Sequence, residues 1–276
     1  MADATEHPDH SRPPEHPAQP GPFDFSGRTV LVTGGTKGVG RGIATAFLEA
    51  GATVVITARA EPEEPIEAVG RAAVFVAADL RDPDAAGAAV QAAAAAGGDR
   101  LDTVVNNAGG APPADAATAS PRFSESIIKL NLLAALHVSQ AANTIMQTQP
   151  DGGSIVNIGS VSGVRPSPGA AAYGAAKAGL ANLTQSLAVE WAPRVRLNVI
   201  TAGLIRTEQA HLFYGDEAGI ARVAATVPLG RLATPRDIAD ACLFLASPRA
   251  SYISGANLLI HGGGERPAFL AAAEGP

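Results

Sequence analysis

Tyr173 and Lys177 stand four positions apart in the stretch Tyr-Gly-Ala-Ala-Lys, a spacing that places both on one face of any helix that forms there. A free tyrosine has a pKa of about 10, so proton transfer near neutral pH requires stabilisation of the phenolate. A lysine ammonium roughly 5 Å away, at an effective dielectric constant of about 20, lowers the tyrosine pKa by about two units. The pair therefore predicts acid–base chemistry, although taken alone it also fits a packed tyrosine beside a surface lysine.

Two polar residues elsewhere in the chain can join this pair. Ser160 comes just after the apolar run Ser154–Ile158, and Asn131 shares a three- and four-residue spacing with apolar residues from Ile127 to Ile145. A buried amide needs hydrogen-bond partners. Either the backbone satisfies Asn131, or this side chain holds a water that connects Lys177 to solvent.

A glycine-rich segment lies between the first β-branched run, Thr29–Thr33, and the first helical stretch, Arg41 to Ala50. Glycine lets the backbone approach a pyrophosphate closely, and the free N–H groups at a helix start favour its negative charge. The glycine spacing differs from the G-x-G-x-x-G fingerprint, but the position between strand and helix predicts a dinucleotide site rather than a structural turn. The residues expected to contact the cofactor here are Gly34, Thr36, Lys37, Gly38, Val39 and Gly40.

The end of the second expected strand predicts which dinucleotide binds. NAD-binding proteins commonly place an acidic residue there, which accepts a hydrogen bond from the ribose 2′-hydroxyl. This chain has Ala58-Arg59 instead, and an arginine can bind a 2′-phosphate through its planar guanidinium. Lys37 adds a second cation, although three nearby glutamates weaken the local positive field. NADP(H) is therefore expected in preference to NAD(H), and the alternative is that Arg59 is a solvated loop residue.

Polar segments also follow the third and fourth expected strands. Asp79, followed by Leu80, is placed to accept a hydrogen bond from an adenine amino group. Asn106-Asn107-Ala108-Gly109 supplies amides and a glycine that permits close approach of a cofactor. Either segment alone is more often a loop cap. Their positions after successive strands favour cofactor binding by Asp79, Leu80, Asn107, Ala108 and Gly109.

Short β-branched runs alternate with Ala-rich helical stretches along the chain. The runs are nearly continuously apolar, as strands are when helices cover both faces of a sheet. This pattern predicts an α/β fold, a single Rossmann-type doubly wound domain with a mostly parallel seven-stranded sheet flanked by helices. Ligands of such folds bind beyond the carboxyl ends of the strands. The expected strands are Thr29–Thr33, Thr53–Thr57, Val74–Ala77, Thr103–Asn106, Ser154–Ile158, Arg196–Ile200 and Asn257–Ile260.

The composition bounds the domain organisation and the partners. The 276 residues are 46% hydrophobic, enough for one large core. We expect a proline-rich disordered tail over residues 1–22, one Rossmann-type domain over residues 23–264 and a C-terminal tail over residues 265–276. A formal charge of −6 argues against nucleic-acid and anionic-membrane partners, and the single cysteine, Cys242, supplies neither a disulfide nor a metal cluster. Since no signal peptide or membrane-spanning run is recognisable, we expect a cytoplasmic protein with a small-molecule partner and no metal.

Several motifs together resemble those of the short-chain dehydrogenase/reductases, over about residues 25–264: the glycine loop, Asn106-Asn107-Ala108-Gly109, Asn131, Ser160 and Tyr173-x3-Lys177. The resemblance implies that Tyr173 is the general acid/base and that Ser160 donates a hydrogen bond to the substrate oxygen. It implies that Lys177 binds the nicotinamide ribose while lowering the Tyr173 pKa, and that Asn131 supports a proton relay. It also implies a homotetramer or homodimer, and cofactor contacts after the sixth strand by Gly203, Ile205 and Thr207.

Two segments depart from the usual pattern of that family. Thr201-Ala202-Gly203 stands where Pro-Gly commonly follows the sixth strand. His261-Gly262-Gly263 stands where Asp-Gly-Gly commonly follows the last strand. Neither segment bears directly on the proton chemistry, but the turn beside the nicotinamide lacks a rigid proline.

These motifs predict an NADP(H)-dependent oxidoreductase that transfers a hydride between the nicotinamide and a carbonyl or secondary alcohol. Pro228-Leu229-Gly230-Arg231 looks like the 3-oxoacyl-carrier-protein-reductase-like branch of the family, which favours a ketone or 3-oxoacyl substrate. A hydroxysteroid or secondary-alcohol dehydrogenase is the enzymatic alternative. A non-catalytic NADP-binding sensor or scaffold is the alternative of another class, and the presence of Tyr173 and Lys177 argues against it.

Overall fold

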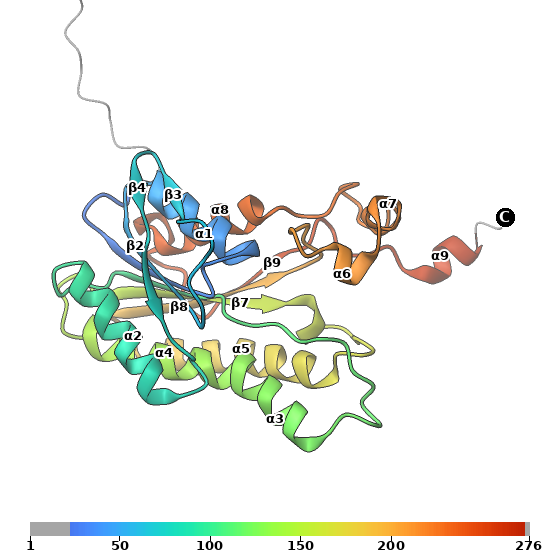
Figure 1. Ribbon diagram of the computed structural model, residues 1–276, viewed down its shortest axis with the longest axis horizontal. Helices are drawn as coiled ribbons and strands as arrows, with labels where there is room; N and C mark the ends of the chain where they lie inside the picture. The colour runs from blue at the N-terminus through green and yellow to red at the C-terminus, as the bar shows by residue number, and fades with distance from the viewer. Residues whose placement is uncertain (1–22, 274–276) are drawn as a thin grey trace, which may run out of the picture.

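Seven parallel strands form the central sheet, in the spatial order β5-β2-β1-β6-β7-β8-β9 (Figure 1). The computed structural model describes residues 23–273, so the tail predicted over residues 1–22 lies outside the described part. All strand pairs of the sheet are parallel, which confirms the predicted fold class. The strands are β1 (Thr29–Thr33), β2 (Thr53–Ala58), β5 (Val74–Ala77), β6 (Thr103–Asn106), β7 (Gly153–Ser160), β8 (Val195–Ala202) and β9 (Asn257–Ile260).

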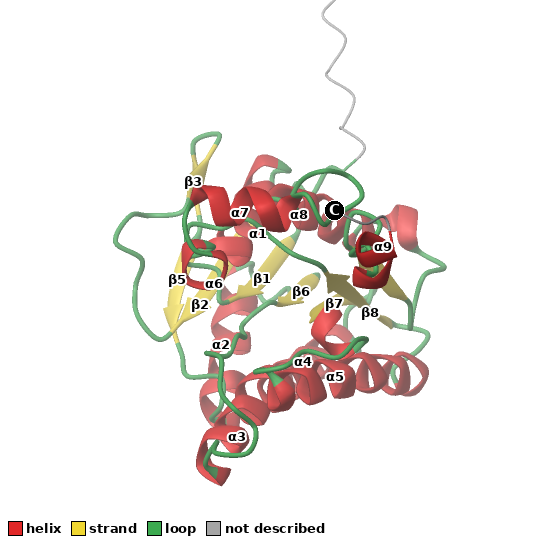
Figure 2. Cartoon of the chain, turned by 90° about the vertical axis from the view of Figure 1, so that its right-hand side faces the viewer, coloured by secondary structure: helices red, strands yellow, loops and turns green. Residues whose placement is uncertain are grey.

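Helices cover both faces of the sheet, with α1 and α8 on one face and α2, α4 and α5 on the other; Figure 2 shows the strands between these two layers. Val30 and Val32 of β1 pack in the core that contains Phe47 of α1, whereas Leu31 packs in the core that contains Val90 of α2. Successive side chains of a strand point to opposite faces, so a strand covered on both faces must be continuously apolar. The helices are α1 (Gly38–Glu49), α2 (Pro83–Ala96), α4 (Ala134–Met146), α5 (Ala171–Glu190) and α8 (Pro235–Ala246).

The chain reverses its direction across the sheet between β1 and β6. It runs outward from β1 to β2 and β5, and then returns to place β6 on the other side of β1. Such a reversal leaves a crevice at the carboxyl ends of the two central strands. The glycine loop after β1 and the asparagine segment after β6 flank this position.

Several short elements are absent from the sequence prediction. The hairpin of β3 (Glu67–Ala68) and β4 (Arg71–Ala72) turns at Val69-Gly70, with φ of +47° and +73°. A β-branched residue rarely adopts positive φ, so the sequence carries no usual hairpin signal there. The remaining elements are α3 (Pro121–Ile128), the π-helical η1 (Lys129–Leu133), the 3₁₀ helices η2 (Val161–Gly163) and η3 (Pro248–Ala250), α6 (His211–Tyr214), α7 (Glu217–Ala224) and α9 (Ala268–Ala273).

The short helix α9 lies within residues 265–276, the stretch assigned to a C-terminal tail from the sequence. Figure 1 shows it projecting from the body of the sheet and its helices. Among the described helices, none combines the length and the apolar character that crossing a membrane would require.

A buried chain of polar side chains ties the sheet to α4 and α5. Asn106 Nδ2 donates to Ser139 Oγ and to Asn157 Oδ1, each at 2.9 Å, and Asn157 Nδ2 donates to Thr184 Oγ1 at 2.9 Å. Thr184 in turn donates to the Leu180 carbonyl at 2.7 Å. Buried polar groups are stabilising only when they are paired, so these bonds favour one arrangement of β6, β7, α4 and α5.

The variant Asn157→Ala should lower the free energy of unfolding by about 2–4 kcal/mol, because it leaves polar groups of Asn106 and Thr184 without their partner in the core. Urea unfolding followed by circular dichroism measures the change. Asn182→Ala, at an exposed position of α5, is the matched control and should change stability by less than about 0.5 kcal/mol. Equal stabilities of the two variants would contradict the importance of the buried chain.

Candidate active site

Close contacts shape the glycine loop between β1 and α1 and leave no room for side chains at two positions. A Cβ atom on Gly40 would lie 2.1 Å from the Gly34 carbonyl oxygen, and one on Gly35 would lie 2.5 Å from Ile56 Cγ2. Gly38 opens α1 with φ of +55°, which glycine adopts readily. The loop therefore brings the N–H groups of the α1 start to the carboxyl edge of the sheet.

Asn107 fastens the segment after β6 to this loop. Its Nδ2 donates to the Thr33 carbonyl at 2.9 Å and to the Gly34 carbonyl at 3.2 Å. Thr33 Oγ1 accepts from the N–H groups of Asn107 and Ala108, both at 3.0 Å. The predicted cofactor residues after β1 and after β6 thus form one unit, in which the Asn107 amide holds the loop.

The residues predicted to contact the adenosine half lie at the ends of β2 and β5 and, for Lys37, in the glycine loop. Arg59 and Lys37 are exposed, and Leu80 is buried. Asp79 accepts from Arg81 Nε at 2.8 Å, and this hydrogen bond is the main reason that the Asp79 pKa falls to about 2. The charge of Arg59 lowers the Asp79 pKa further. Asp79 is thus a carboxylate already paired with Arg81.

Tyr173 and Lys177 share one face of α5, with Lys177 Nζ 5.7 Å from the centre of the tyrosine ring. Only 5% of Lys177 is exposed, and Nζ donates to the Ile158 carbonyl of β7 at 2.7 Å. Burial lowers the pKa of the Lys177 ammonium to about 8. The lysine therefore holds its charge with a single backbone acceptor in a largely dry environment.

The Tyr173 pKa is raised, whereas the sequence predicted that it would be lowered. Burial raises the pKa of the phenol, and the hydrogen bond with the Ser160 side chain lowers it only in part. The predicted lowering by Lys177 is not met in this arrangement, because desolvation of the phenolate outweighs the stabilising contacts. Tyr173 is consequently a neutral phenol at neutral pH.

Ser160 is the last residue of β7, which continues two residues past the end predicted at Ile158. Its Oγ accepts from the Ser162 N–H at 3.2 Å, which caps the short helix η2. The same side chain is bonded to Tyr173. The strand end therefore presents the serine hydroxyl next to the phenol.

Asn131 lies in the π-helical turn η1 and is bonded to the backbone at both ends of its amide. Oδ1 accepts from the Gly110 N–H at 2.7 Å, and Nδ2 donates to the carbonyls of Gly110 and Ile127 at 2.9 and 3.0 Å. A Cβ on Gly109 would lie 2.6 Å from Asn131 Oδ1 and 3.3 Å from Lys177 Nζ. The Asn131 side chain thus has backbone hydrogen-bond partners, which is the first of the two alternatives drawn from the sequence. Asn131 and Lys177 both border Gly109.

The two unusual segments noted in the sequence meet at the ends of β8 and β9. The Gly203 N–H donates to the Ile260 carbonyl at 2.8 Å, and a Cβ on Gly203 would lie 2.7 Å from His261 Cβ. The chain then pairs Ile205 with Ala233 and passes the start of α1. The two segments that depart from the family pattern are therefore neighbours. Their close approach requires a glycine at position 203.

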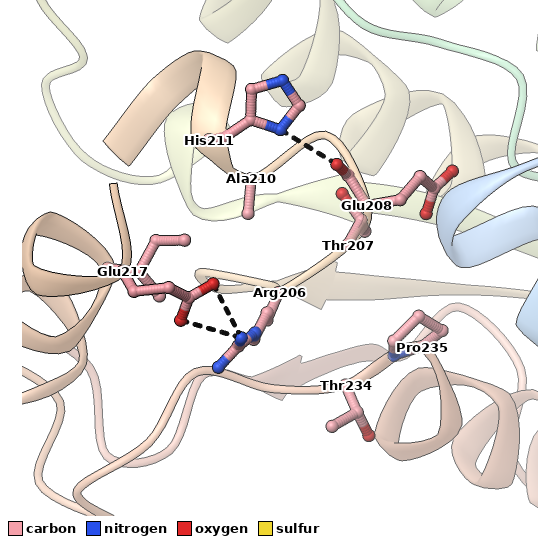
Figure 3. Close-up of a pocket in the computed structure, with 9 residues that line it drawn as sticks. Arg206, Thr207, Glu208, Ala210, His211, Glu217, Thr234 and Pro235 are labelled. Carbon is pink, nitrogen blue, oxygen red and sulfur yellow. Dashed lines mark hydrogen bonds and ion pairs between the residues drawn. The ribbon is translucent and has the colours of Figure 1, made fainter. Parts of the chain in front are cut away.

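A cavity of about 450 Å³ lies between the segment after β8 and the start of α8 (Figure 3). On one side, Arg206 Nη2 contacts both carboxylate oxygens of Glu217, at 2.9 and 3.0 Å. On the other, His211 Nδ1 lies 3.0 Å from the Glu208 carbonyl oxygen. No lining residue belongs to the Tyr173–Lys177 pair. The cavity adjoins α1 instead, because a Cβ on Gly42 of α1 would lie 2.4 Å from Cβ of the lining residue Pro235.

Comparison with known proteins decides the family. Residues 34–265 match the protein family described as enoyl-(acyl carrier protein) reductase. The chain belongs to the short-chain dehydrogenase/reductase family. It is 39% identical to an uncharacterized oxidoreductase of Mycobacterium tuberculosis, over 87% of this chain and 93% of that protein. It is 35% identical to the 3-oxoacyl-[acyl-carrier-protein] reductase FabG of Vibrio harveyi, over 87% of this chain and 98% of that protein.

A solved structure is similar along nearly its whole length. The crystal structure of a putative short-chain alcohol dehydrogenase from Sinorhizobium meliloti 1021 superposes with a TM-score of 0.80 and 39% identity, over 87% of this chain and 97% of that one. Short-chain dehydrogenase/reductases are oxidoreductases that use nicotinamide cofactors, which places this chain among enzymes acting on alcohol or carbonyl groups.

In this short-chain dehydrogenase/reductase, the structure brings most of the predicted site residues to one edge of the sheet. Three contacts of the site have no counterpart in the sequence prediction. These are the Lys177 bond to the β7 backbone, the Arg81 bond to Asp79 and a bond from the Gly38 N–H to Glu208 Oε1 at 2.8 Å. Arg81 and Asp79 are two residues apart, so their contact could have been predicted from the sequence. Gly38 and Glu208 are 170 residues apart, and no local pattern indicates their contact.

The buried ammonium makes stability depend on pH in a defined direction. The unfolded chain holds the Lys177 proton up to its ordinary pKa of 10.5, whereas the folded chain releases it near pH 8. Between these values the unfolded chain binds more protons, so the stability of the folded chain rises with pH.

Lys177→Met removes this dependence. The stability of the variant relative to the unchanged protein, measured as the difference in their free energies of unfolding, should be highest below pH 8. This difference should fall by about 3 kcal/mol between pH 8 and pH 10.5. Urea unfolding at several pH values measures the difference. Lys129→Met, at an exposed position, is the control and should show no comparable trend. Parallel stability curves for Lys177→Met and the unchanged protein would contradict burial of a charged lysine.

Proposed function

We propose that this protein is an NADP(H)-dependent ketone or 3-oxoacyl reductase. The observation that carries the proposal is the Tyr173 phenol, bonded to Ser160 and next to the buried Lys177 ammonium, at the same sheet edge as the glycine loop. The similarity to a 3-oxoacyl-[acyl-carrier-protein] reductase supports this substrate class. The similarity to a putative short-chain alcohol dehydrogenase supports the alternative, a secondary-alcohol or hydroxysteroid dehydrogenase.

The residues present fit a dinucleotide. The glycine loop has no space for a Cβ at Gly40, and the side chain of the N-cap residue Lys37 makes no capping hydrogen bond to the start of α1. This loop would hold the pyrophosphate, and Arg59 with Lys37 would hold a 2′-phosphate. Asp79 and Leu80 would border the adenine. The nicotinamide half would lie among Asn107, Ala108, Gly109, Tyr173, Lys177, Gly203, Ile205 and Thr207.

Proton transfer to the substrate oxygen falls to Tyr173. When bound, the cofactor supplies or accepts the hydride. In the direction of reduction, a carbonyl oxygen needs a proton donor, and burial keeps the Tyr173 phenol protonated. Ser160 orients that oxygen by a hydrogen bond, and the Lys177 ammonium stabilises the phenolate left after transfer. Asn131 holds the Gly110 backbone, next to the Gly109 that borders Lys177, and supports the path by which the phenol regains its proton.

The remaining parts of the proposal concern the cell. We propose a homotetramer or homodimer, as the family resemblance implies, and a location in the cytoplasm. The formal charge of −6 supports a small-molecule partner over a nucleic acid. A non-catalytic NADP-binding sensor or scaffold is the alternative of another class. NADPH and NADH oxidation over a panel of 3-oxoacyl thioesters, ketosteroids and small ketones separates these functions.

Tyr173→Phe should lower turnover of an active substrate by roughly 10²- to 10⁴-fold, because the ring stays while the transferable proton is lost. Steady-state kinetics measures the change, and NADPH binding should stay within roughly twofold, since the pyrophosphate and 2′-phosphate contacts are untouched. Tyr252→Phe, at a fully exposed tyrosine, is the control and should leave turnover unchanged. Full activity of Tyr173→Phe would rule out the proposed mechanism.

Arg59→Ala should raise the KM for NADPH roughly 10- to 100-fold, because it removes charge-assisted hydrogen bonds to the 2′-phosphate. The KM for NADH should change little, since NADH lacks that phosphate. Arg71→Ala, at an exposed arginine of β4, is the control. An equal effect on both cofactors, or no effect on either, would contradict the role proposed for Arg59.

A further inference from the structure

The start of α1 already binds an anion that belongs to the chain itself. Glu208 Oε1 accepts a hydrogen bond from the Gly38 N–H at 2.8 Å. Gly38 is the first residue of α1, and the first turn of this helix contains no acidic residue of its own. Figure 3 shows the Glu208 side chain directed away from His211, towards the pale blue ribbon. The partial positive charge of the helix start is thus offset by a carboxylate from a distant segment.

The segment around Glu208 is held on both sides. A Cβ on Gly38 would lie 3.7 Å from Thr207 Cγ2, so Thr207 adjoins the glycine loop. The Glu208 carbonyl contacts His211 at the start of α6, and Arg206 is paired with Glu217 at the start of α7. The Glu208 bond therefore connects the glycine loop to the chain segment that carries α6 and α7.

We propose that Glu208 is an internal competitor for the pyrophosphate of the cofactor. This inference rests on the proposed function, in which the same N–H groups receive the pyrophosphate. A carboxylate and a phosphate cannot share the Gly38 N–H, and their charges repel each other at this distance. Cofactor binding must therefore displace Glu208, which releases the segment from Arg206 to Glu217 from the glycine loop. The affinity for the cofactor is lowered by the energy of the bond that is broken.

The charge of Glu208 distinguishes this role from ordinary loop packing. Glu208→Gln keeps the shape of the side chain and an acceptor oxygen, but removes the charge that competes with phosphate. The variant should bind NADPH and NADH more tightly, each by the same factor of roughly three to ten, because both carry the pyrophosphate. Adenosine 2′-monophosphate lacks the pyrophosphate, so its affinity should not change.

Fluorescence titration with NADPH and NADH, and calorimetry with adenosine 2′-monophosphate, measure these affinities on the full chain. Glu217→Gln is the matched control, because it removes the same charge from the opposite side of the same cavity without touching the glycine loop. Thermal unfolding of both variants establishes that they are folded. The expected result is tighter dinucleotide binding by Glu208→Gln alone.

Unchanged or weaker dinucleotide binding by Glu208→Gln would overturn the proposal, as would equal tightening by Glu217→Gln. Tighter binding of adenosine 2′-monophosphate would also overturn it, because the effect would then not involve the pyrophosphate. These outcomes leave the proposed function intact. Failure of the unchanged protein to bind either dinucleotide would instead reject the proposed function.

Discussion

The buried ammonium of Lys177 is the feature on which the arrangement of the site depends. A charge in a dry environment is costly unless it is hydrogen-bonded, and Nζ finds its acceptor on the Ile158 carbonyl of β7. Ser160 lies two residues further along this strand, and Tyr173 lies one turn earlier on the helix that carries the lysine. Fastening the ammonium to β7 therefore sets the phenol against the serine hydroxyl.

Close approach of backbones makes that contact possible. A Cβ on Gly163 would lie 2.7 Å from the Ala178 nitrogen, and one on Gly174 would lie 2.6 Å from the Ser162 carbonyl oxygen. Both glycines let α5 pack directly against the turn that follows β7. The glycine loop repeats this principle, since it is the absence of a side chain at Gly40 that lets α1 begin against the end of β1.

The fold could be predicted largely from the sequence, because its strands are local runs of apolar residues. All seven strands of the main sheet were predicted within two residues at either end, while the β3–β4 hairpin was missed because its turn places Val69 at positive φ. The π-helical turn at Asn131 was also missed, since the apolar spacing around it fits an ordinary helix. Such departures depend on contacts between elements, which local spacing does not record.

The sequence by itself determined the family pattern, the order of the elements and the helical spacing of Tyr173 and Lys177, because each follows from residues close together along the chain. Only the tertiary structure decided the electrostatics of the site. Burial raises the Tyr173 pKa, against the direction predicted from its lysine neighbour, because desolvation depends on everything packed around the ring. The Glu208 carboxylate reaches the Gly38 N–H across 170 residues. Solvent exclusion and long-range hydrogen bonds exist only once the chain has folded, so residue type and spacing do not reveal them.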